Sequence, residues 1–322
     1  MKKLIIGILL SILLIYLSVR GIDFQAVMDG FQKIDYLYIY PTAFLIVAMQ
    51  VIRSVRWGIL LSPLEKVGPW ALFSVTNVGF MAVVAIPARL GELARPYLIT
   101  KKSNIKMSSA LGTIFIERIF DSLTVFAIFA VILFLMPLPP WLVRSSMLFI
   151  SLTLVIIALM FLLLFKRDAC MKSLNPIICR LPGRFAPKIN SLIHHFIDGF
   201  QIMKDLKRLV AVALLSALFW FCDILSIYLM FGAFHLQLPP LAACVLLVIL
   251  MIGIAIPAGP GFVGNWHFFC ILGLALFGIP KADALSFAII YHFLSIGIII
   301  VLGLIFLPFN RFSFKDLTVN SK

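Results

Sequence analysis

Six apolar stretches of about membrane length constrain the fold of this chain more than any other feature. They cover residues 4–19, 38–60, 109–135, 146–165, 209–231 and 284–307. A helix of about 20 mostly apolar residues spans the hydrocarbon core of a bilayer. Only helices and closed barrels satisfy their backbone hydrogen bonds there, and the alternating pattern of barrel strands is absent from this sequence. We therefore expect an all-α polytopic membrane protein with about six full spans.

The composition excludes a soluble domain and gives no sign of a nucleic-acid partner. Hydrophobic residues make up 63% of the chain and charged residues 12%, which is far from the composition of soluble domains. The formal net charge of +14 is better explained by basic loops on the cytoplasmic side, because no nucleic-acid-binding motif accompanies it. The first span follows Lys2 and Lys3 as a signal peptide would. This span is followed by Arg20 and not by the small-residue cleavage site of a signal peptide. We therefore expect it to stay in the protein as a membrane span.

Two further apolar stretches, 70–100 and 240–278, are each interrupted by the same tetrapeptide. Ala-Ile-Pro-Ala occurs at 85–88 and again at 255–258. Broken hydrophobic segments at matching places in two halves are typical of transporters built from structural repeats. If 70–100 crossed the membrane once, the basic residues in 101–106 would face outside, against the cytoplasmic preference of Lys and Arg. Both stretches are therefore predicted to be re-entrant helical hairpins.

Other sequence is shared between the halves in the same order. The tetrapeptide Asp-Gly-Phe-Gln at 29–32 recurs at 198–201, each time in an amphipathic segment that either lies in the membrane interface or packs on protein. Three full crossings in each half give the halves opposite topology. We expect one transmembrane domain, 1–322, made of an inverted repeat of 1–140 and 145–310. Both termini are expected to be cytoplasmic, in a bacterial-type inner membrane.

Charged and histidine side chains cluster within the apolar segments. A charge within the hydrocarbon costs about 2.5–3.5 kcal/mol on insertion scales, so such residues are functional candidates. The candidates for substrate binding are Arg53, Arg89, Glu92, Arg95, Glu117, Arg118 and Asp121, together with Gly259, Gly261 and Asn265 at the second break. The candidates for proton coupling are Glu117, Asp121, Asp223, His267 and His292.

An anion site is the functional interpretation of this cluster. Half-helices 88–99 and 262–277 are expected to begin inside the membrane and to present backbone N–H groups and positive dipole ends. Arginine forks match phosphate oxygens, and glycines let a ligand approach the backbone.

The alternative interpretation is an internal network of ion pairs that holds the first hairpin against the apolar stretches 38–60 and 109–135. In that case Glu117 and Asp121 hold arginines in place rather than carry protons. His267 and His292 then only donate hydrogen bonds between helices. Arg56 stands beside Trp57 near the end of its span, so we expect it to extend to the membrane interface.

No motif of hydrolytic or transfer chemistry occurs. The sequence has no GxSxG, no GxxxxGK and no HExxH. Its five cysteines form neither CxxC nor a Cys/His metal pattern. We expect no enzyme activity, no catalytic residues, no cofactor and no metal.

Four motifs in this order resemble a known membrane family. They are Arg53-x-x-Arg56-Trp57, Pro87-x-Arg89-Leu90-Gly91-Glu92-x-x-Arg95, Glu117-Arg118-x-x-Asp121 and Pro257-Ala-Gly-Pro-Gly261-x-x-Gly264. Together they make the chain similar, over nearly its whole length, to the flippase-like family that includes the membrane half of bacterial lysylphosphatidylglycerol synthases. The resemblance implies translocation of a lipid, such as an anionic or aminoacylated phospholipid or a polyprenyl-phosphate carrier.

The chain departs from that family in two respects. Many relatives have an acidic residue after the second Gly-rich break, where this chain has Asn265 and His267. The aminoacyl-transferase domain of the two-part synthases is also absent from the sequence, so the synthase activity is not expected.

Three functions remain open from the sequence. The first is a flippase for an anionic phosphate-bearing lipid, with membrane lipids as partners and no nucleic acid. The second is a secondary transporter of a small soluble anion. The third is a membrane subunit that does not transport and presents lipid to a lipid-modifying enzyme. A homo-oligomer also stays open.

Overall fold

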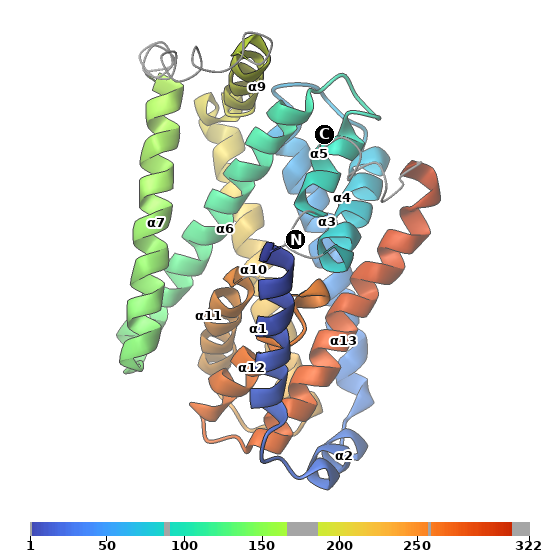
Figure 1. Cartoon of the computed structure of the whole chain (residues 1–322), viewed down its shortest axis with the longest axis vertical. Coiled ribbons are helices and arrows are strands. Elements are labelled where there is room, and N and C mark those ends of the chain that lie inside the picture. The colour runs from blue at the N-terminus through green and yellow to red at the C-terminus, as the bar shows by residue number, and fades with distance from the viewer. Residues whose placement is uncertain (1, 87–90, 166–185, 257–258, 311–322) are drawn as a thin grey trace.

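The computed structural model describes residues 2–86, 91–165, 186–256 and 259–310 (Figure 1). The first half contains α1 (Lys2–Val19), α2 (Phe24–Gln32), η1 (Tyr36–Tyr38), α3 (Ile39–Leu61), α4 (Pro69–Ala85), α5 (Ala94–Ile99) and α6 (Met107–Leu135). The second half contains α7 (Pro140–Phe165), α9 (Ala186–Asp198), η3 (Gln201–Lys204), α10 (Leu206–Ala233), α11 (Pro240–Ala255), η4 (Pro260–Phe262), α12 (Asn265–Ala275), α13 (Lys281–Phe306) and η5 (Pro308–Asn310). These ranges contain no β-strand.

Five of these helical segments are long and apolar enough to cross a membrane. They are Tyr36–Leu61, Met107–Leu135, Pro140–Leu162, Leu206–Ala233 and Lys281–Phe306. The segments Gly7–Val19 and Phe24–Gln32, bent by 84° relative to each other, make a sixth candidate together. Each of the six predicted spans thus corresponds to a helix, and the prediction of an all-α polytopic membrane protein is confirmed. The membrane in which it resides and the orientation of its termini stay predictions.

The two interrupted stretches form helical hairpins. Pro69 and Pro240 lie in the first turns of α4 and α11, where a missing N–H leaves no hydrogen bond unmade. Both helices end at the Ala-Ile-Pro-Ala tetrapeptide, where Ile86 and Ile256 are extended. After each break the chain returns, since α5 packs against α4 and α12 packs against α11.

The second arm of each hairpin is shorter than predicted. A half-helix over 88–99 was expected, but a single 3-10 turn at 91–93 precedes the six-residue α5. In the second hairpin α12 begins at Asn265, because Gly261 (φ 64°), Phe262 (φ 57°) and Gly264 (φ 92°) adopt left-handed conformations that interrupt a helix. Residues 87–90, which include Arg89, lie outside the described residues.

The repeated Asp-Gly-Phe-Gln tetrapeptide marks two similar helix contacts. The short helix α2 packs on α13, and α9 packs on α6, so each amphipathic segment lies against the last long helix of the other half. A Cβ at Gly30 would lie 2.7 Å from Ser286 Oγ, and one at Gly199 would lie 2.9 Å from Gly112 Cα. Both glycines therefore allow the neighbouring helix to approach closely. The division into inverted repeats 1–140 and 145–310 stays a prediction that these paired contacts favour.

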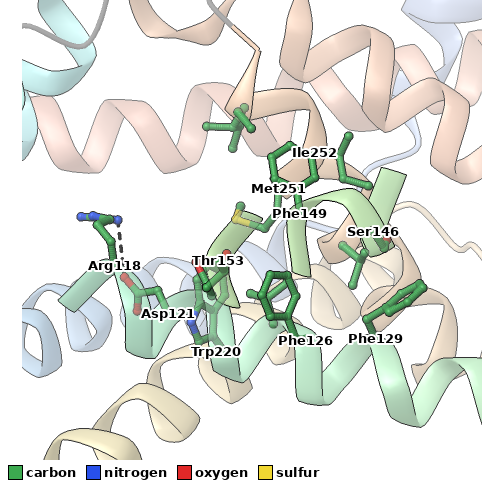
Figure 2. Close-up of a pocket in the computed structure, with 15 residues that line it drawn as sticks. Arg118, Asp121, Phe126, Phe129, Ser146, Phe149, Thr153, Trp220, Met251 and Ile252 are labelled. Carbon is green, nitrogen blue, oxygen red and sulfur yellow. Dashed lines mark hydrogen bonds and ion pairs between the residues drawn. The ribbon is translucent and has the colours of Figure 1, made fainter. Parts of the chain in front are cut away.

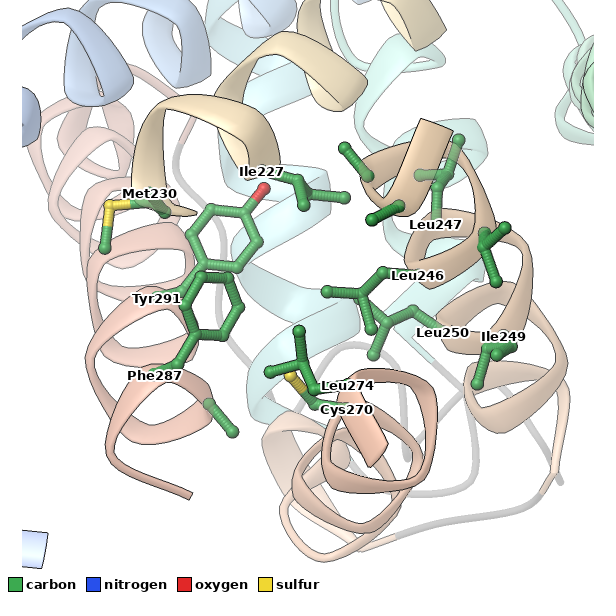
Figure 3. Packing of buried hydrophobic residues seen from close by; sticks show 14 of the residues in the cluster. Ile227, Met230, Leu246, Leu247, Ile249, Leu250, Cys270, Leu274, Phe287 and Tyr291 are labelled. Carbon is green, nitrogen blue, oxygen red and sulfur yellow. The ribbon is translucent and has the colours of Figure 1, made fainter. Parts of the chain in front are cut away.

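Two clusters of buried apolar side chains hold the hairpins in place. One joins α10–α13 and includes Ile227, Leu246, Leu274 and Phe287 (Figure 3). The other joins α3–α6 with α9 and α10. The helix α7 stands at the edge of the bundle (Figure 1) and exposes apolar residues along its length. Such a helix is suited to face lipid.

Candidate functional site

A buried network of ion pairs ties the first hairpin to α3 and α6. Glu117 of α6 is 0% exposed. Its Oε1 lies 3.1 Å from Arg56 Nη2 of α3, and its Oε2 lies 3.0 Å from Arg95 Nη2 of α5. Arg56 Nη1 also lies 2.6 Å from Asp121 Oδ1 and donates to Ser216 Oγ of α10 at 2.8 Å. The network therefore connects four helices through charged groups that are shielded from solvent.

The prediction that Arg56 extends to the membrane interface is wrong. Its side chain is 1% exposed, and two carboxylates of α6 hold it inside the bundle. The neighbouring Trp57 is also fully buried and donates from Nε1 to Thr113 Oγ1 at 3.2 Å. Nearness to the end of a span did not fix the direction of these side chains, because α6 supplies strong acceptors on the inner side.

Arg95 is held as tightly as Arg56. Its guanidinium carbon lies 4.3 Å from the centre of the Trp57 ring and 5.1 Å from that of Phe80. With both Nη atoms donating to Glu117, the side chain is 2% exposed. Arg95 thus fits the bracing interpretation, in which ion pairs fix the hairpin. Substrate binding by Arg95, Glu117 or Asp121 stays a prediction.

Arg53 differs from these two arginines, because it forms no ion pair with a carboxylate among the described residues. Its Nη1 donates to Gln50 Oε1 at 2.6 Å, and Gln50 donates to Asn77 Oδ1 of α4 at 3.3 Å. The guanidinium carbon lies 4.2 Å from the centre of the Phe80 ring and 4.6 Å from that of Phe219. Two aromatic faces and one amide therefore position a cation whose remaining donors have no hydrogen-bond partner among the described residues.

This guanidinium lines a cavity of about 240 Å³ between the two hairpins. The polar and aromatic side chains on its walls come from both halves and include Arg53, Glu92, Arg118, Asp223, Trp266, Tyr291, His292 and Ser295. The structure therefore brings five predicted site residues to one cavity: Arg53, Glu92, Arg118, Asp223 and His292.

Opposite residues on α10 and α13 are joined by hydrogen bonds beside the cavity. Asp223 accepts from Tyr291 Oη at 3.3 Å, and that hydroxyl lies 2.6 Å from Ser226 Oγ. The rings of His267 and His292 meet edge to face at 4.9 Å, and Trp266 stacks on His292 at 5.1 Å. Proton coupling through Asp223 or these histidines stays a prediction.

The candidates at the second break hold the hairpin together. Asn265 Nδ2 donates to the carbonyl oxygens of Gly253 at 3.1 Å and Ile256 at 3.2 Å, at the end of α11. The Gly259 N–H donates to Ser11 Oγ of α1 at 2.8 Å. Gly261 takes a left-handed turn and is not part of the cavity wall. Ligand binding by these three residues stays a prediction.

Sequence reasoning missed the aromatic residues that frame Arg53 and the amides that orient it. Phe80 and Phe219 are two of 30 phenylalanines, so nothing in the sequence distinguished them. Gln50 and Asn77 carried a usable signal, because each is the only side-chain amide in a mainly apolar helix. Among the described residues no group of three or more His, Cys, Asp or Glu side chains is placed to hold a metal ion.

Replacing Asn265 with alanine is expected to destabilise the protein by about 1–3 kcal/mol, because two carbonyl oxygens at the end of α11 lose their side-chain donor. Thermal unfolding in detergent measures the effect. Thr124→Ala is the matched control, since that hydroxyl only donates to Phe120 O within its own helix. Equal melting temperatures for the two variants would show that Asn265 does not hold the hairpin.

The comparisons with known proteins agree with this architecture. The family described as the lysylphosphatidylglycerol synthase TM region matches residues 4–303. A UPF0104 membrane protein of Methanocaldococcus jannaschii is 28% identical over 223 residues, which is 68% of this chain and 90% of that protein. A second UPF0104 membrane protein, from Methanothermobacter thermautotrophicus, is 25% identical over 302 residues, which is 87% of this chain and 88% of that protein.

A more distant relative is the glycosyltransferase AglD of Haloferax volcanii. It is 27% identical over 133 residues, which is 40% of this chain and 21% of that protein. No solved structure matches the chain. Because the family match extends over nearly the whole sequence, the chain belongs to the family of the lysylphosphatidylglycerol synthase TM region.

Proposed function

We propose that this protein translocates an anionic, phosphate-bearing lipid, whose head group passes through the cavity between the two hairpins. The observation that carries the proposal is the state of Arg53. It faces the cavity, it has no carboxylate partner among the described residues, and its guanidinium lies between two aromatic rings. A half-buried cation that has no carboxylate partner among the described residues is suited to bind an anion that balances its charge.

The geometry of Arg53 suits a phosphate group. One nitrogen is used by Gln50, which fixes the plane of the guanidinium and leaves the other side of the fork for a ligand. Arginine forks bind phosphate oxygens through paired hydrogen bonds. The guanidinium lies against the apolar rings of Phe80 and Phe219, and a hydrogen bond in such a setting is stronger than one in water.

The other charges on the walls suit reversible binding. Asp223 and Glu92 face the same cavity as Arg53 and Arg118, so the site is not strongly positive before substrate arrives. A site for transport has to release its substrate, and carboxylates that compete with the phosphate for the arginines favour release. In this proposal the buried ion pairs of Glu117 provide a rigid frame, and the protein acts as a transporter without catalytic residues.

Family membership supports a lipid rather than a small soluble anion. The family description names the membrane region of a synthase whose product, lysylphosphatidylglycerol, is a lipid. A relative that shares part of the chain is a glycosyltransferase, so this membrane unit also occurs in a protein with another activity. The lipid named in the family description and the apolar and charged walls of the cavity together favour lipid handling.

The proposal is tested with purified protein in phosphatidylcholine vesicles that contain fluorescent phosphatidylglycerol or fluorescent diacylglycerol. A quencher added outside the vesicles removes the fluorescence of lipid in the outer leaflet. The rate of fluorescence loss therefore measures how fast the lipid reaches that leaflet. Faster movement of phosphatidylglycerol but not of diacylglycerol, compared with protein-free vesicles, is expected. Uptake of inorganic phosphate without lipid movement would favour the small-anion transporter. If neither phosphate nor lipid moves, the proposal is wrong and a subunit that does not transport is favoured.

A further inference from the structure

A second pocket, of about 250 Å³, lies between α6, α7 and α11 (Figure 2). Its walls are mainly apolar and include Phe126 and Phe129 of α6, Phe149 of α7 and Met251 and Ile252 of α11. Charge is present at one end only, where Arg118 and Asp121 meet (Figure 2). The pocket is therefore charged at one end and mainly apolar along its length, as an anionic lipid is.

The second pocket and the cavity of Arg53 share part of their walls. Arg118, Trp220, Met251 and Ile254 line both. The charged end of the apolar pocket therefore adjoins the cavity that the proposed function assigns to the head group. A molecule with a charged end and a hydrocarbon chain fits the two spaces together.

The outer wall of the second pocket is a helix suited to face lipid. α7 packs on α6 and α11 and exposes Leu148, Leu152 and Val155. At the end of α11, Ala255 lines the pocket and is exposed. The pocket is thus open where Ala255 is exposed, and its wall α7 presents an apolar outer face to the hydrocarbon chains that surround a membrane protein.

Arg118 carries the surplus charge at the junction. Its guanidinium lies 3.4 Å from Asp121 Oδ2 and 3.7 Å from Glu117 Oε1. Both carboxylates already pair more closely with Arg56 and Arg95, at 2.6–3.1 Å. Three arginines thus share two carboxylates, and the loosely held one is 47% exposed.

We propose that the second pocket, between α6, α7 and α11, binds an acyl chain of the transported lipid, and that Arg118 contacts its phosphate before Arg53 does. This rests on the proposed function and adds a lateral route from the bilayer to the cavity. Arg118 exchanges its long contacts with Asp121 and Glu117 for the phosphate oxygens. Because those carboxylates keep their shorter pairs with Arg56 and Arg95, the frame persists while Arg118 moves.

The route is tested by photo-crosslinking in phosphatidylcholine vesicles that contain phosphatidylglycerol with a diazirine on its acyl chain. Thr153→Trp fills the pocket from α7 (Figure 2) and is expected to lower crosslinking to α6 and α11 about tenfold, as a loss of a few buried methylene contacts would. Ser151→Trp, on the exposed face of the same helix, is the matched control. Equal crosslinking in both variants overturns the route.

The role of Arg118 is tested by comparing that probe with diacylglycerol carrying the same diazirine chain. The wild type is expected to favour the phosphatidylglycerol probe, and Arg118→Gln to lose that preference. Arg144→Gln, at an exposed position of α7, is expected to keep it. A preserved preference in Arg118→Gln shows that Arg118 does not contact the phosphate.

These measurements separate the route from the proposed function. If Thr153→Trp does not fold, the crosslinked peptides of the wild type still locate the acyl chain of the probe. Crosslinked peptides of α6 and α11 support binding in the pocket. Crosslinked peptides only from the outer face of α7 overturn it. Crosslinking in the pocket without lipid movement in the transport assay contradicts the transport function and supports the binding site. Lipid movement that Thr153→Trp leaves unchanged supports the function and overturns the route.

Discussion

Replacing Glu117 with glutamine is expected to destabilise the protein by about 3–5 kcal/mol, the largest effect on stability of any single change considered. The reason is that Glu117, with no exposed surface, is the acceptor for both Arg56 and Arg95. A neutral amide leaves two buried guanidinium groups without their full counter-charge. Thermal or denaturant unfolding of the detergent-solubilised variant measures the change in the free energy of unfolding.

The matched control for this prediction is Glu65→Gln. Glu65 Oε2 accepts from the backbone N–H of Asn104 at 2.8 Å in an exposed setting, so the change is expected to alter stability by well under 1 kcal/mol. The two variants make the same chemical substitution and differ in burial and in the number of arginines that depend on the carboxylate. If Glu117→Gln were as stable as Glu65→Gln, the buried network would not hold the first hairpin.

Replacing Arg53 with glutamine is expected to lower lipid transport about ten- to a hundredfold, because charged hydrogen bonds of about 1.5–3 kcal/mol to the phosphate are lost. Stability is expected to change little, since among the described residues Arg53 has no ion pair to lose. Arg53→Lys keeps the charge but not the fork, so intermediate transport is expected. The vesicle assay with fluorescent phosphatidylglycerol measures all three proteins.

The control for Arg53 is Arg144→Gln, which removes an exposed arginine from α7 and is expected to transport like the wild type. Melting temperatures establish that each variant is folded. Undiminished transport by folded Arg53→Gln would exclude Arg53 as a ligand of the head group. The cavity would then need another cation, and among the described residues Arg118 also lies on its wall.

Much of the fold could be predicted from the sequence because its cause is local. Runs of apolar residues fix where helices cross a bilayer, and Pro with Gly fixes where they break. The charge of the loops then predicts whether an interrupted stretch crosses the membrane or returns to the side from which it entered. These properties depend on residues that are neighbours along the chain, so no knowledge of packing was needed to place the spans and the hairpins.

The pairing of the arginines could not be predicted, because it depends on how helices rotate against one another. Glu92 and Arg95 both fall within the half-helix predicted over 88–99, but a 3-10 turn at 91–93 precedes α5. Arg95 is turned inward to Glu117, while Glu92 lines the cavity. Arg56 and Arg53, three residues apart on α3, also take different roles, since α6 places its carboxylates opposite only one of them.

The most direct test of the central claim is a cryo-electron microscopy structure of the protein in nanodiscs that contain phosphatidylglycerol. The account predicts density for a lipid phosphate in the cavity between the hairpins, within hydrogen-bond distance of the Arg53 guanidinium. Well-resolved density in which Arg53 contacts only protein, with no phosphate in the cavity, would contradict it.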